Sequence, residues 1–324
     1  MDRILCTGGG GFIGSHLAKY LYQQGQFVRI VDIKFDDYIQ EKHYSERLQL
    51  DLREFENCLK ATEGIDKVYN HAANMGGIGF ITSVSADVMR DNVLINTHML
   101  EACVRNKVKR FLFSSSACVY ANYKQTNSDV PGLKEEDAYP ADPNEAYGWE
   151  KLFTEEMVKA YQIDYGLDAR IARYHNIYGQ EGTYKGGKEK APAALCRKVV
   201  EAGNPGTIEI WGDGKATRSF CHVDDCVKGT VALMESDYDK PINIGSDRLV
   251  SVDELADIII KISGKQISKT YDLSAPEGVK GRNADLTLVR NVLGWEPQVS
   301  LEEGLAKTYR WIEMMIQKDK ESEK

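Results

Sequence analysis

The chain has 324 residues, of which 42% are hydrophobic and 28% charged, so it can form one large domain or two interlocked ones with a substantial core. Its net charge of −8 argues against a general nucleic-acid or anionic-membrane surface, since both need a basic face. Seven cysteines without close pairing favour free thiols in a reducing compartment, and we find neither a signal-peptide pattern nor a membrane-spanning apolar run, so we expect a cytoplasmic protein.

The first half of the chain alternates short apolar strands with amphipathic helices. We expect strands at residues 3–6, 27–33, 47–52, 67–71 and 110–114, and helices at residues 12–24, 88–106 and 146–161. This alternation predicts an α/β fold of the Rossmann type, with a doubly wound parallel sheet and helices on both faces. Ligands of such sheets bind at the carboxyl ends of the strands, so the residues that follow each strand are the first candidates for a site.

After about residue 175 the alternation weakens, and glycine-rich turns separate shorter elements. This change predicts a smaller, irregular α/β lobe. We therefore assign residues 1–175, with a return segment near residues 216–246, to the dinucleotide-binding domain. Residues 176–215 and 247–324 are assigned to a substrate-binding lobe.

A glycine-rich turn with the sequence TGGGGFIG lies between the first strand and the first helix. Gly8, Gly11 and Gly14 permit a tight turn, a close approach of a pyrophosphate to the backbone and close packing of the helix on the sheet. Phe12 and Ile13 open the helix, whose free N–H groups favour phosphate. Taken alone, the glycine triplet could equally be a plain turn.

Two carboxylates follow the next two strands and support a dinucleotide site. Asp32 lies 18 residues after Gly14, where it would accept hydrogen bonds from the adenosine ribose hydroxyls and repel a 2′-phosphate. NAD is therefore favoured over NADP, although Lys34 makes the preference less than absolute. Asp51 follows the third strand, where this fold commonly places a carboxylate near adenine, the alternative being a cap for a helix at residues 53–62.

The Tyr-x-x-x-Lys spacing, which places both side chains on one helix face, occurs four times: at Tyr38/Lys42, Tyr120/Lys124, Tyr147/Lys151 and Tyr184/Lys188. Only Tyr147 and Lys151 open a long predicted helix about thirty residues after the strand that ends at Ser114. In such a pair the lysine would lower the tyrosine pKa, and the tyrosinate would take a hydroxyl proton while hydride leaves to NAD. Ser116 could complete the triad, the alternative being an ordinary helix with a surface tyrosine and lysine.

These features together resemble the extended short-chain dehydrogenase/reductases of the NAD-dependent epimerase/dehydratase type. Three further stretches, NMGGIG at 74–79, SSSACVY at 114–120 and YKGGKEKAP at 184–192, resemble the GDP-mannose 3,5-epimerase family, and the similarity runs over almost the full chain. The resemblance implies that Cys118 and Lys190 are the acid/base pair of epimerisation. On their own, the cysteine would be read as core and the lysine as surface.

The implied chemistry is consistent with these residue types. Protons at sugar C3 and C5 are very weakly acidic, but oxidation at C4 places a ketone beside both carbons, so each proton can leave through an enolate. Inversion needs a base on one face of the ring and an acid on the other. Related 4,6-dehydratases carry an acidic pair where this chain has Ala117 and Cys118, which argues against dehydration.

The resemblance also implies the substrate contacts Met75, Gly76, Ser116, His175, Asn176, Lys190, Trp211, Arg218 and Arg282. Asn176 would hydrogen-bond the diphosphate or sugar, and His175 is a weaker candidate for the same role. Arg218 and Arg282 would clamp the diphosphate, because guanidinium groups pair bidentately with phosphate oxygens. Trp211 would pack near guanine, unless it is a core residue.

We therefore expect an NAD-dependent isomerase that converts GDP-mannose to GDP-L-galactose and GDP-L-gulose, working as a homodimer and with no nucleic-acid or membrane partner. One alternative is a nucleotide-sugar 4-epimerase that uses only Tyr147 and Lys151. Another is a non-catalytic NAD-sensing regulator, which the intact tyrosine–lysine pair disfavours. The grouping of Cys221, His222 and Cys226 does not have a usual zinc spacing, so we expect no metal, and we read Asp224 as the N-cap of a helix at residues 225–234.

Overall fold

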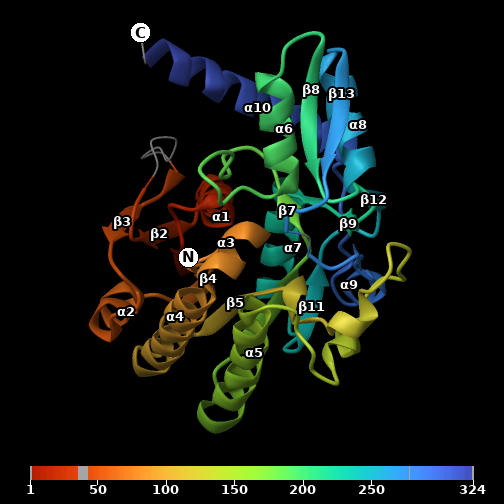
Figure 1. Ribbon diagram of the computed structural model, residues 1–324. Helices are drawn as coiled ribbons and strands as arrows, with labels where there is room; N and C mark the ends of the chain where they lie inside the picture. Colours follow the sequence, from red (N-terminus) through yellow and green to blue (C-terminus); the bar gives the residue numbers. More distant parts are fainter. Residues whose placement is uncertain (1, 36–42, 277, 323–324) are drawn as a thin grey trace.

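The computed structural model describes residues 2–35, 43–276 and 278–322 (Figure 1). Seven strands form the central sheet: β1 (Arg3–Thr7), β2 (Phe27–Asp32), β3 (Glu46–Gln49), β4 (Lys67–Asn70), β5 (Arg110–Ser116), β6 (Ala169–Tyr174) and β11 (Pro241–Ile244). All pairs are parallel, in the order β11-β6-β5-β4-β1-β2-β3. From β1 the chain adds β2 and β3 on one side, and it then returns to add β4, β5, β6 and β11 on the other side. Such a switch point in the strand order, here between β1 and β4, leaves a crevice at the carboxyl ends of the strands.

Helices cover both faces of this sheet. The helices α1 (Phe12–Gln23) and α7 (Val223–Glu235) pack on one face, where Leu17 and Val227 share a core with Ile30 of β2. The helices α2 (Phe55–Thr62), α4 (Ser85–Arg105) and α5 (Ala146–Tyr165) cover the other face, where Met99 and Val158 share a core with β5. The predicted doubly wound parallel sheet is confirmed.

Two predictions about the strands need correction. The predicted end of β5 at Ser114 is wrong, because Ser115 and Ser116 continue the ladder and pair with Arg173 and Tyr174 of β6. β6 itself carries two arginines and was not predicted from its sequence. Both arginines are buried, and Arg173 forms an ion pair of 2.6 Å with the equally buried Glu155, so the charge is balanced inside the sheet layer.

Two readings of helix caps also differ from the structure. α2 begins after Glu54, not after Asp51, so the alternative that Asp51 caps it is wrong. α7 is capped by His222, whose ring accepts a hydrogen bond from the backbone N–H of Asp224, so Asp224 lies in the first turn and is not the N-cap.

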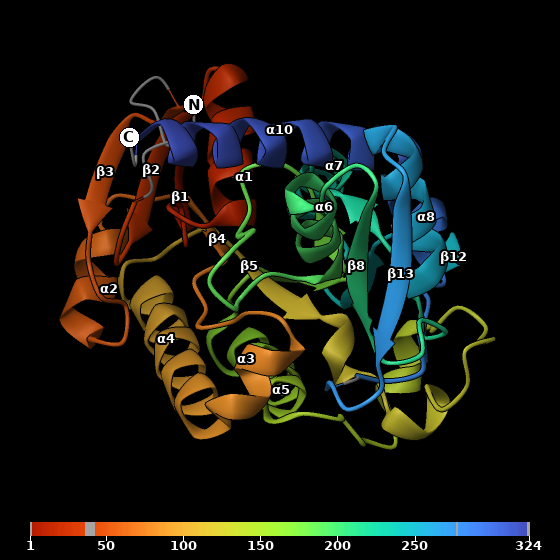
Figure 2. The same ribbon diagram turned by 45° about the horizontal axis from the view of Figure 1, so that its top comes forward.

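The smaller part of the fold is built around its own core. The strands β8 (Gly206–Trp211) and β13 (Ile267–Asp272) form a parallel pair, and α6 (Ala191–Glu201), α8 (Val252–Ser263) and α10 (Leu301–Ser322) pack together beside it. The remaining elements are short: α3 (Ile78–Ser83), α9 (Thr287–Leu293), β7 (Ile177–Tyr178), β9 (Thr217–Ser219), β10 (Cys221–His222), β12 (Leu249–Ser251) and β14 (Gly281–Arg282). Figures 1 and 2 show β8, β13, α6 and α8 on the opposite side of the molecule from α2 and α4.

Candidate active site

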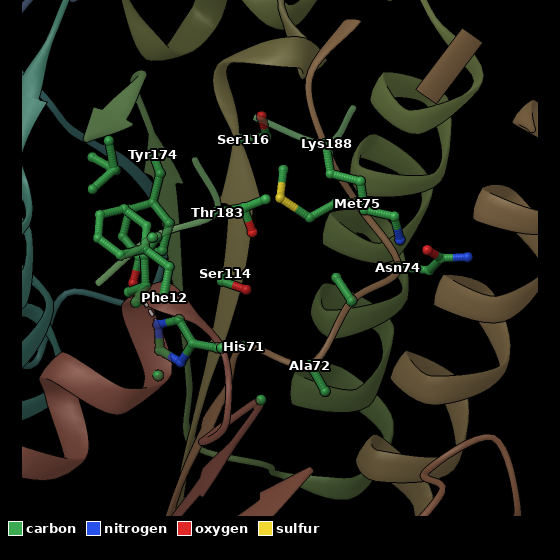
Figure 3. Close-up of a pocket in the computed structure, with 18 of the residues that line it drawn as sticks. Phe12, His71, Ala72, Asn74, Met75, Ser114, Ser116, Tyr174, Thr183 and Lys188 are labelled. Carbon is green, nitrogen blue, oxygen red and sulfur yellow. Dashed lines mark hydrogen bonds between the residues drawn. The ribbon is translucent and has the colours of Figure 1, made fainter. Parts of the chain in front are cut away.

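A cavity of about 590 Å³ lies at the carboxyl ends of β1, β2, β4, β5 and β6. Figure 3 shows Phe12 and Tyr174 on one side of it, Asn74 and Met75 on the other. The predicted site residues that line it are Gly8, Gly11, Phe12, Ile13, Gly14, Asp32, Asp51, Met75, Gly76, Ser116, Tyr147, Lys151, Asn176 and Lys190. Residues far apart in the sequence thus meet in one cleft, between the sheet and the smaller lobe.

The loop between β1 and α1 packs so closely against neighbouring backbone that two of its glycines have no room for a side chain. A Cβ atom on Gly14 would lie 2.2 Å from the carbonyl oxygen of Gly8, and one on Gly10 would lie 2.1 Å from the carbonyl oxygen of Lys34. Gly11 caps α1 without a side-chain hydrogen bond, so the first N–H groups of the helix remain available to an anion. This cradle fits the pyrophosphate of a dinucleotide.

The carboxylate of Asp32 closes one end of the cradle. It accepts hydrogen bonds from the backbone N–H groups of Gly10 at 3.0 Å and Ile33 at 2.7 Å, which fix its orientation. A third, from the backbone N–H of Lys34, is 3.4 Å long. Burial raises the pKa of this carboxyl, and the three backbone hydrogen bonds oppose that rise. Such a carboxylate has lone pairs left for two ribose hydroxyls. The donor set therefore fits an adenosine ribose that carries no 2′-phosphate.

Asp51 follows the end of β3, and its carboxylate forms an ion pair with Arg53 at 2.6 Å. Hydrogen bonds from Arg53 hold the pKa of the Asp51 carboxyl below its ordinary value. Both side chains line the cavity, so this end of the cleft carries an ion pair and not a lone carboxylate. The arginine was not singled out from the sequence.

Tyr147 and Lys151 enter the cavity from the first turns of α5, and Ser116 enters it from the end of β5. The ammonium of Lys151 lies 5.5 Å from the centre of the Tyr147 ring and 3.6 Å from a carboxylate oxygen of Glu150. Glu150 is fully buried and accepts a hydrogen bond from Asn92 at 2.9 Å. Lys151 thus forms an ion pair with a buried carboxylate that the sequence did not reveal as part of the site.

The pKa of Tyr147 differs from the prediction. Burial raises it well above its ordinary value, the charges of Cys118 and Glu150 raise it further, and only the hydrogen bond with Ser116 lowers it. The prediction that this pKa is lowered is therefore wrong, because desolvation of the phenolate dominates.

Lys190 lines the cavity, whereas Cys118 is not among the lining residues and follows Ser116 and Ala117, which are. Cys118 lies on the 3₁₀ turn that follows Ser116, and Lys190 is the residue from which α6 starts. Burial alone raises the pKa of the Cys118 thiol, but the charges of Arg282 and Lys190 and hydrogen bonds with Ser116 and Arg282 bring it below its ordinary value. Desolvation in the cleft lowers the pKa of the Lys190 ammonium, while the Cys118 charge opposes that lowering.

Four predicted substrate contacts lie outside the cavity wall. His175 is fully buried, bonds to Asn243 at 2.8 Å and has its pKa lowered to about 3 by burial, so a direct ligand contact for it is contradicted. Trp211 is 48% exposed at the end of β8 and lies near Gly79, so it is no core residue. Arg218 donates to the backbone carbonyls of Thr217 and Val279. Arg282 donates to Gln125 and to the sulfur of Cys118.

Several lining residues were missed in the sequence. His71, Asn74, Ser114, Tyr174, Thr183 and Lys188 all face the cavity (Figure 3). The imidazole of His71 was not singled out from the sequence. Its hydrogen bond to the Tyr174 hydroxyl joins residues 103 positions apart, which no local pattern can show.

The other tyrosine–lysine pairs have structural roles. Tyr120 is buried and bonds to Asn243, and Tyr184 bonds to Asp319 at 2.9 Å. The pair Tyr38/Lys42 lies outside the described residues. Across residues 2–35, 43–276 and 278–322, no helix is long and apolar enough to cross a membrane, and no three metal-binding side chains cluster.

Comparison with known proteins places these features in a family. Residues 4–245 match the model of the NAD dependent epimerase/dehydratase family. A curated relative, GDP-mannose 3,5-epimerase 1 of Oryza sativa subsp. japonica, is 48% identical over 98% of this chain and 83% of its own length.

Two solved structures are also similar. The UDP-glucose 4-epimerase of Thermotoga maritima with UDP-glucose has a TM-score of 0.86 at 27% identity, over 97% of this chain and 99% of its own. The UDP-glucuronic acid 4-epimerase of Bacillus cereus, in complex with UDP-glucuronic acid and NAD, has a TM-score of 0.83 at 28% identity, over 97% of this chain and 99% of its own.

Proposed function

This chain belongs to the NAD-dependent epimerase/dehydratase family, and from that premise we propose that it is an NAD-dependent isomerase that converts GDP-mannose to GDP-L-galactose and GDP-L-gulose. The observation that carries the proposal is the arrangement of two pairs: Tyr147 and Lys151 line the cleft, and Lys190, which also lines it, interacts electrostatically with Cys118 on the turn directly after Ser116. The first pair suits oxidation and reduction at C4. The second suits proton exchange at the carbons beside it.

The glycine cradle at the start of α1 would hold the pyrophosphate of NAD, and the Asp32 carboxylate would hold its adenosine ribose. When bound, NAD supplies the acceptor for the C4 hydride, the donor for its return, and a positive charge beside Tyr147. Tyr147 takes the C4 hydroxyl proton as the C4–H bond breaks, and it gives a proton back to the same oxygen when the ketone is reduced. Ser116 bonds Tyr147 and orients it.

Cys118 and Lys190 exchange protons with C5 and C3 of the 4-keto sugar. One group removes a proton to give an enolate, and the other delivers a proton to the opposite face, which inverts the carbon.

Met75, Gly76 and Asn176 line the sugar end of the cleft, and we assign the GDP portion to the side that carries Trp211, Arg218 and Arg282. Arginines there would pair with the diphosphate. We retain the division into a dinucleotide domain (1–175 with 216–246) and a sugar-nucleotide lobe (176–215 and 247–324), in which β11 and α7 return to the sheet.

The proposal is tested by the products that variants form from GDP-mannose. Cys118→Ala and Lys190→Ala are expected to abolish formation of both epimers on anion-exchange chromatography, while Lys185→Ala, which removes an exposed lysine paired with Asp319, serves as the matched control. Full epimerisation by Cys118→Ala would contradict the assigned acid/base pair.

A 4-epimerase is the alternative, favoured by the two similar structures. It would invert only C4, need only Tyr147 and Lys151, and tolerate Cys118→Ala. The product chromatogram therefore separates the two functions directly.

We also propose that the protein is a cytoplasmic homodimer. All seven cysteines are free thiols, as expected in a reducing compartment. Trp149 and Phe153 are 45% and 53% exposed one turn apart on α5, with exposed Met89 and Leu94 on the adjacent α4, and such an apolar face suits a helical interface between two copies. Phe153→Glu should convert a dimer to a monomer in light scattering, whereas Ile163→Glu, near the end of α5, should not.

A further inference from the structure

Glu150 is a fully buried carboxylate on α5, one residue before Lys151. One of its oxygens lies 3.6 Å from the Lys151 ammonium, which is also buried and lies 4.8 Å from the centre of the Phe113 ring. A buried charge without a partner is strongly destabilising, so the carboxylate and the ammonium each depend on the other.

A chain of buried hydrogen bonds connects Glu150 with the start of the glycine turn. The hydroxyl of Thr7, the last residue of β1, donates to Oδ1 of Asn70 at 2.8 Å. Nδ2 of Asn70 donates to Oδ1 of Asn96 at 2.9 Å, and Nδ2 of Asn96 donates to Oε2 of Glu150 at 3.4 Å. All four side chains are buried, so the chain joins the strand end before the glycine turn to this carboxylate through the protein interior.

The backbone fixes the direction of these bonds. The oxygen of Thr7 accepts from the backbone N–H groups of His71 and Ala72, both at 3.0 Å, so the hydroxyl hydrogen is left to donate. A donating hydroxyl requires Oδ1 of Asn70 as its acceptor, which leaves Nδ2 as the donor to the next asparagine. The direction passes on in the same way, and the chain ends with an amide donor that bonds to Glu150.

A second branch reaches the other oxygen of Glu150. The backbone N–H of Asn74, a residue that lines the cavity, donates to Oδ1 of Asn92 at 2.6 Å. This bond directs Nδ2 of Asn92 to Oε1 of Glu150, to which it donates at 2.9 Å. Both oxygens thus accept from amide N–H groups, and an ionised carboxylate, which only accepts, fits this arrangement.

Resting on the proposed function, we propose that Glu150 is a positioning residue for C4 oxidation: its carboxylate is the counter-charge that holds the Lys151 ammonium beside Tyr147. The two branches tie the carboxylate to the glycine turn and to the loop at Asn74, so the ammonium keeps a fixed place relative to both segments. In the step itself, the Tyr147 phenolate takes the C4 hydroxyl proton, the C4–H bond breaks, and its electron pair passes as hydride to NAD. Lys151 and Glu150 keep their charges throughout.

The titratable groups around this pair agree with the assignment. Burial raises the pKa of Glu150, and the charge of Lys151 is the largest effect that opposes this rise. His71, after β4, interacts with the Lys151 charge, but burial lowers its pKa to about 4, so it is neutral. Burial raises the pKa of Tyr147, and the charges of Cys118 and Glu150 raise it further. From α4, the pair meets the two asparagine amides, which are uncharged.

The C4 step can be followed apart from the inversions. In the NAD-loaded Cys118→Ala enzyme, we expect GDP-mannose to be oxidised at C4 without inversion, so the absorbance of NADH reports this step alone. In that background, Glu150→Gln should raise the pH of half-maximal NADH formation by one unit or more, which slows the step about tenfold at pH 7. The reason is that a buried ammonium without its counter-charge no longer stabilises the Tyr147 phenolate.

Two further variants in the same background serve as controls. Glu150→Asp keeps the charge and should recover part of the rate. Glu156→Gln removes an exposed carboxylate that is paired with Lys159 on the same helix, and it should leave the pH profile unchanged.

The direction of the shift decides the inference. A shift to lower pH in Glu150→Gln would overturn it, because Glu150 would then act on Tyr147 directly as a negative charge and not through Lys151. A smaller amount of active enzyme with an unchanged pH profile would also overturn it, because Glu150 would then have only a structural role.

Urea unfolding of the NAD-loaded proteins tests the pairing without turnover. Glu150→Gln should lower the unfolding midpoint of the wild type, because it leaves the Lys151 ammonium buried and unpaired. In the Lys151→Met background the same change should raise the midpoint, because it removes an unpaired carboxylate. The double variant carries neither charge of the pair, so it tests the pairing even if Glu150→Gln alone folds poorly. Equal losses in both backgrounds would overturn the inference.

The two measurements separate this inference from the proposed function. Opposite effects of Glu150→Gln on the unfolding midpoint, in a protein that forms no NADH from GDP-mannose, would contradict the proposed function and leave the Glu150–Lys151 pair intact. Epimerisation of GDP-mannose by the wild type, together with equal losses in both backgrounds, would leave the function standing and overturn the role of Glu150.

Discussion

Nε2 of His71 and the hydroxyl of Tyr174 lie 2.8 Å apart at the wall of the cavity, and the order of donors behind them fixes which atom carries the proton. Thr230 donates to the carbonyl of Cys226 at 2.7 Å, so its oxygen must accept from Tyr174 at 2.8 Å. The Tyr174 oxygen in turn accepts from Nε2–H of His71. Burial lowers the pKa of His71 to about 4, so the ring is neutral.

Tyr174→Phe should lower the free energy of unfolding by about 1–3 kcal/mol, because it leaves the buried Nε2–H of His71 without an acceptor. The double variant His71→Leu/Tyr174→Phe should recover most of that loss, since both partners of the bond are then apolar. Urea unfolding of the three proteins measures the effect, with Tyr123→Phe at an exposed site as the control. Additive losses in the double variant would show that the bond does not couple the two residues.

Tyr147→Phe should slow product formation by about 10²–10⁴-fold, the usual range for loss of one acid/base group. The substitution removes only the hydroxyl, so the amount of NAD that co-purifies should not change. Tyr165→Phe, at the exposed end of the same helix, is the matched control and should be fully active. Near-wild-type rates in Tyr147→Phe would contradict the role of this tyrosine in C4 oxidation.

Asp32→Ser should weaken NAD binding at least tenfold, because hydrogen bonds to a charged group contribute about 1.5–3 kcal/mol. It should also reduce the difference in affinity between NAD and NADP, since the carboxylate that repels a 2′-phosphate is gone. Titration calorimetry of the cofactor-free enzyme with each dinucleotide measures both effects. Asp247→Ser, at an exposed pair with Arg290, should change neither. An unaltered NAD affinity in Asp32→Ser would place the ribose elsewhere.

The pH profile of kcat/KM should be bell-shaped, with both limbs at lower pH than the ordinary pKa values of a thiol and a lysine ammonium would give. The thiol of Cys118 has a lowered pKa, so activity should fall with decreasing pH only below about 8.5, the ordinary thiol value. The ammonium of Lys190 also has a lowered pKa, so the alkaline fall should begin below about 10.4, the ordinary lysine value. A wild-type acid limb that begins above about 8.5 would contradict the lowered pKa of the Cys118 thiol.

The sequence predicted the parts of this protein whose signal is local. The glycine turn, Asp32 and the spacing of Tyr147 and Lys151 each lie within one strand–turn–helix unit, so their pattern was visible. Strand β6 was missed because Arg170 and Arg173 interrupt its apolar run. In the structure Arg170 pairs with Asp168 and donates to the carbonyl of Ser236, and Arg173 pairs with Glu155 of α5, so both charges are compensated.

Contacts between distant segments could not be predicted. The approach of Arg282 to Cys118 joins residues 164 positions apart, and it depends on how the segment before β14 pairs with Gln125. The same limitation applies to the pKa of Tyr147, because its direction is set by burial and not by the neighbouring lysine that the motif suggests.

Proton NMR of the purified enzyme with GDP-mannose in deuterated water tests the central claim most directly. The account predicts deuterium at C3 and C5 of the sugar, together with GDP-L-galactose and GDP-L-gulose, with no added NAD because the cofactor stays bound and is regenerated in each cycle. Complete absence of deuterium from carbon, with or without inversion at C4, would contradict epimerisation through a 4-keto sugar by Cys118 and Lys190.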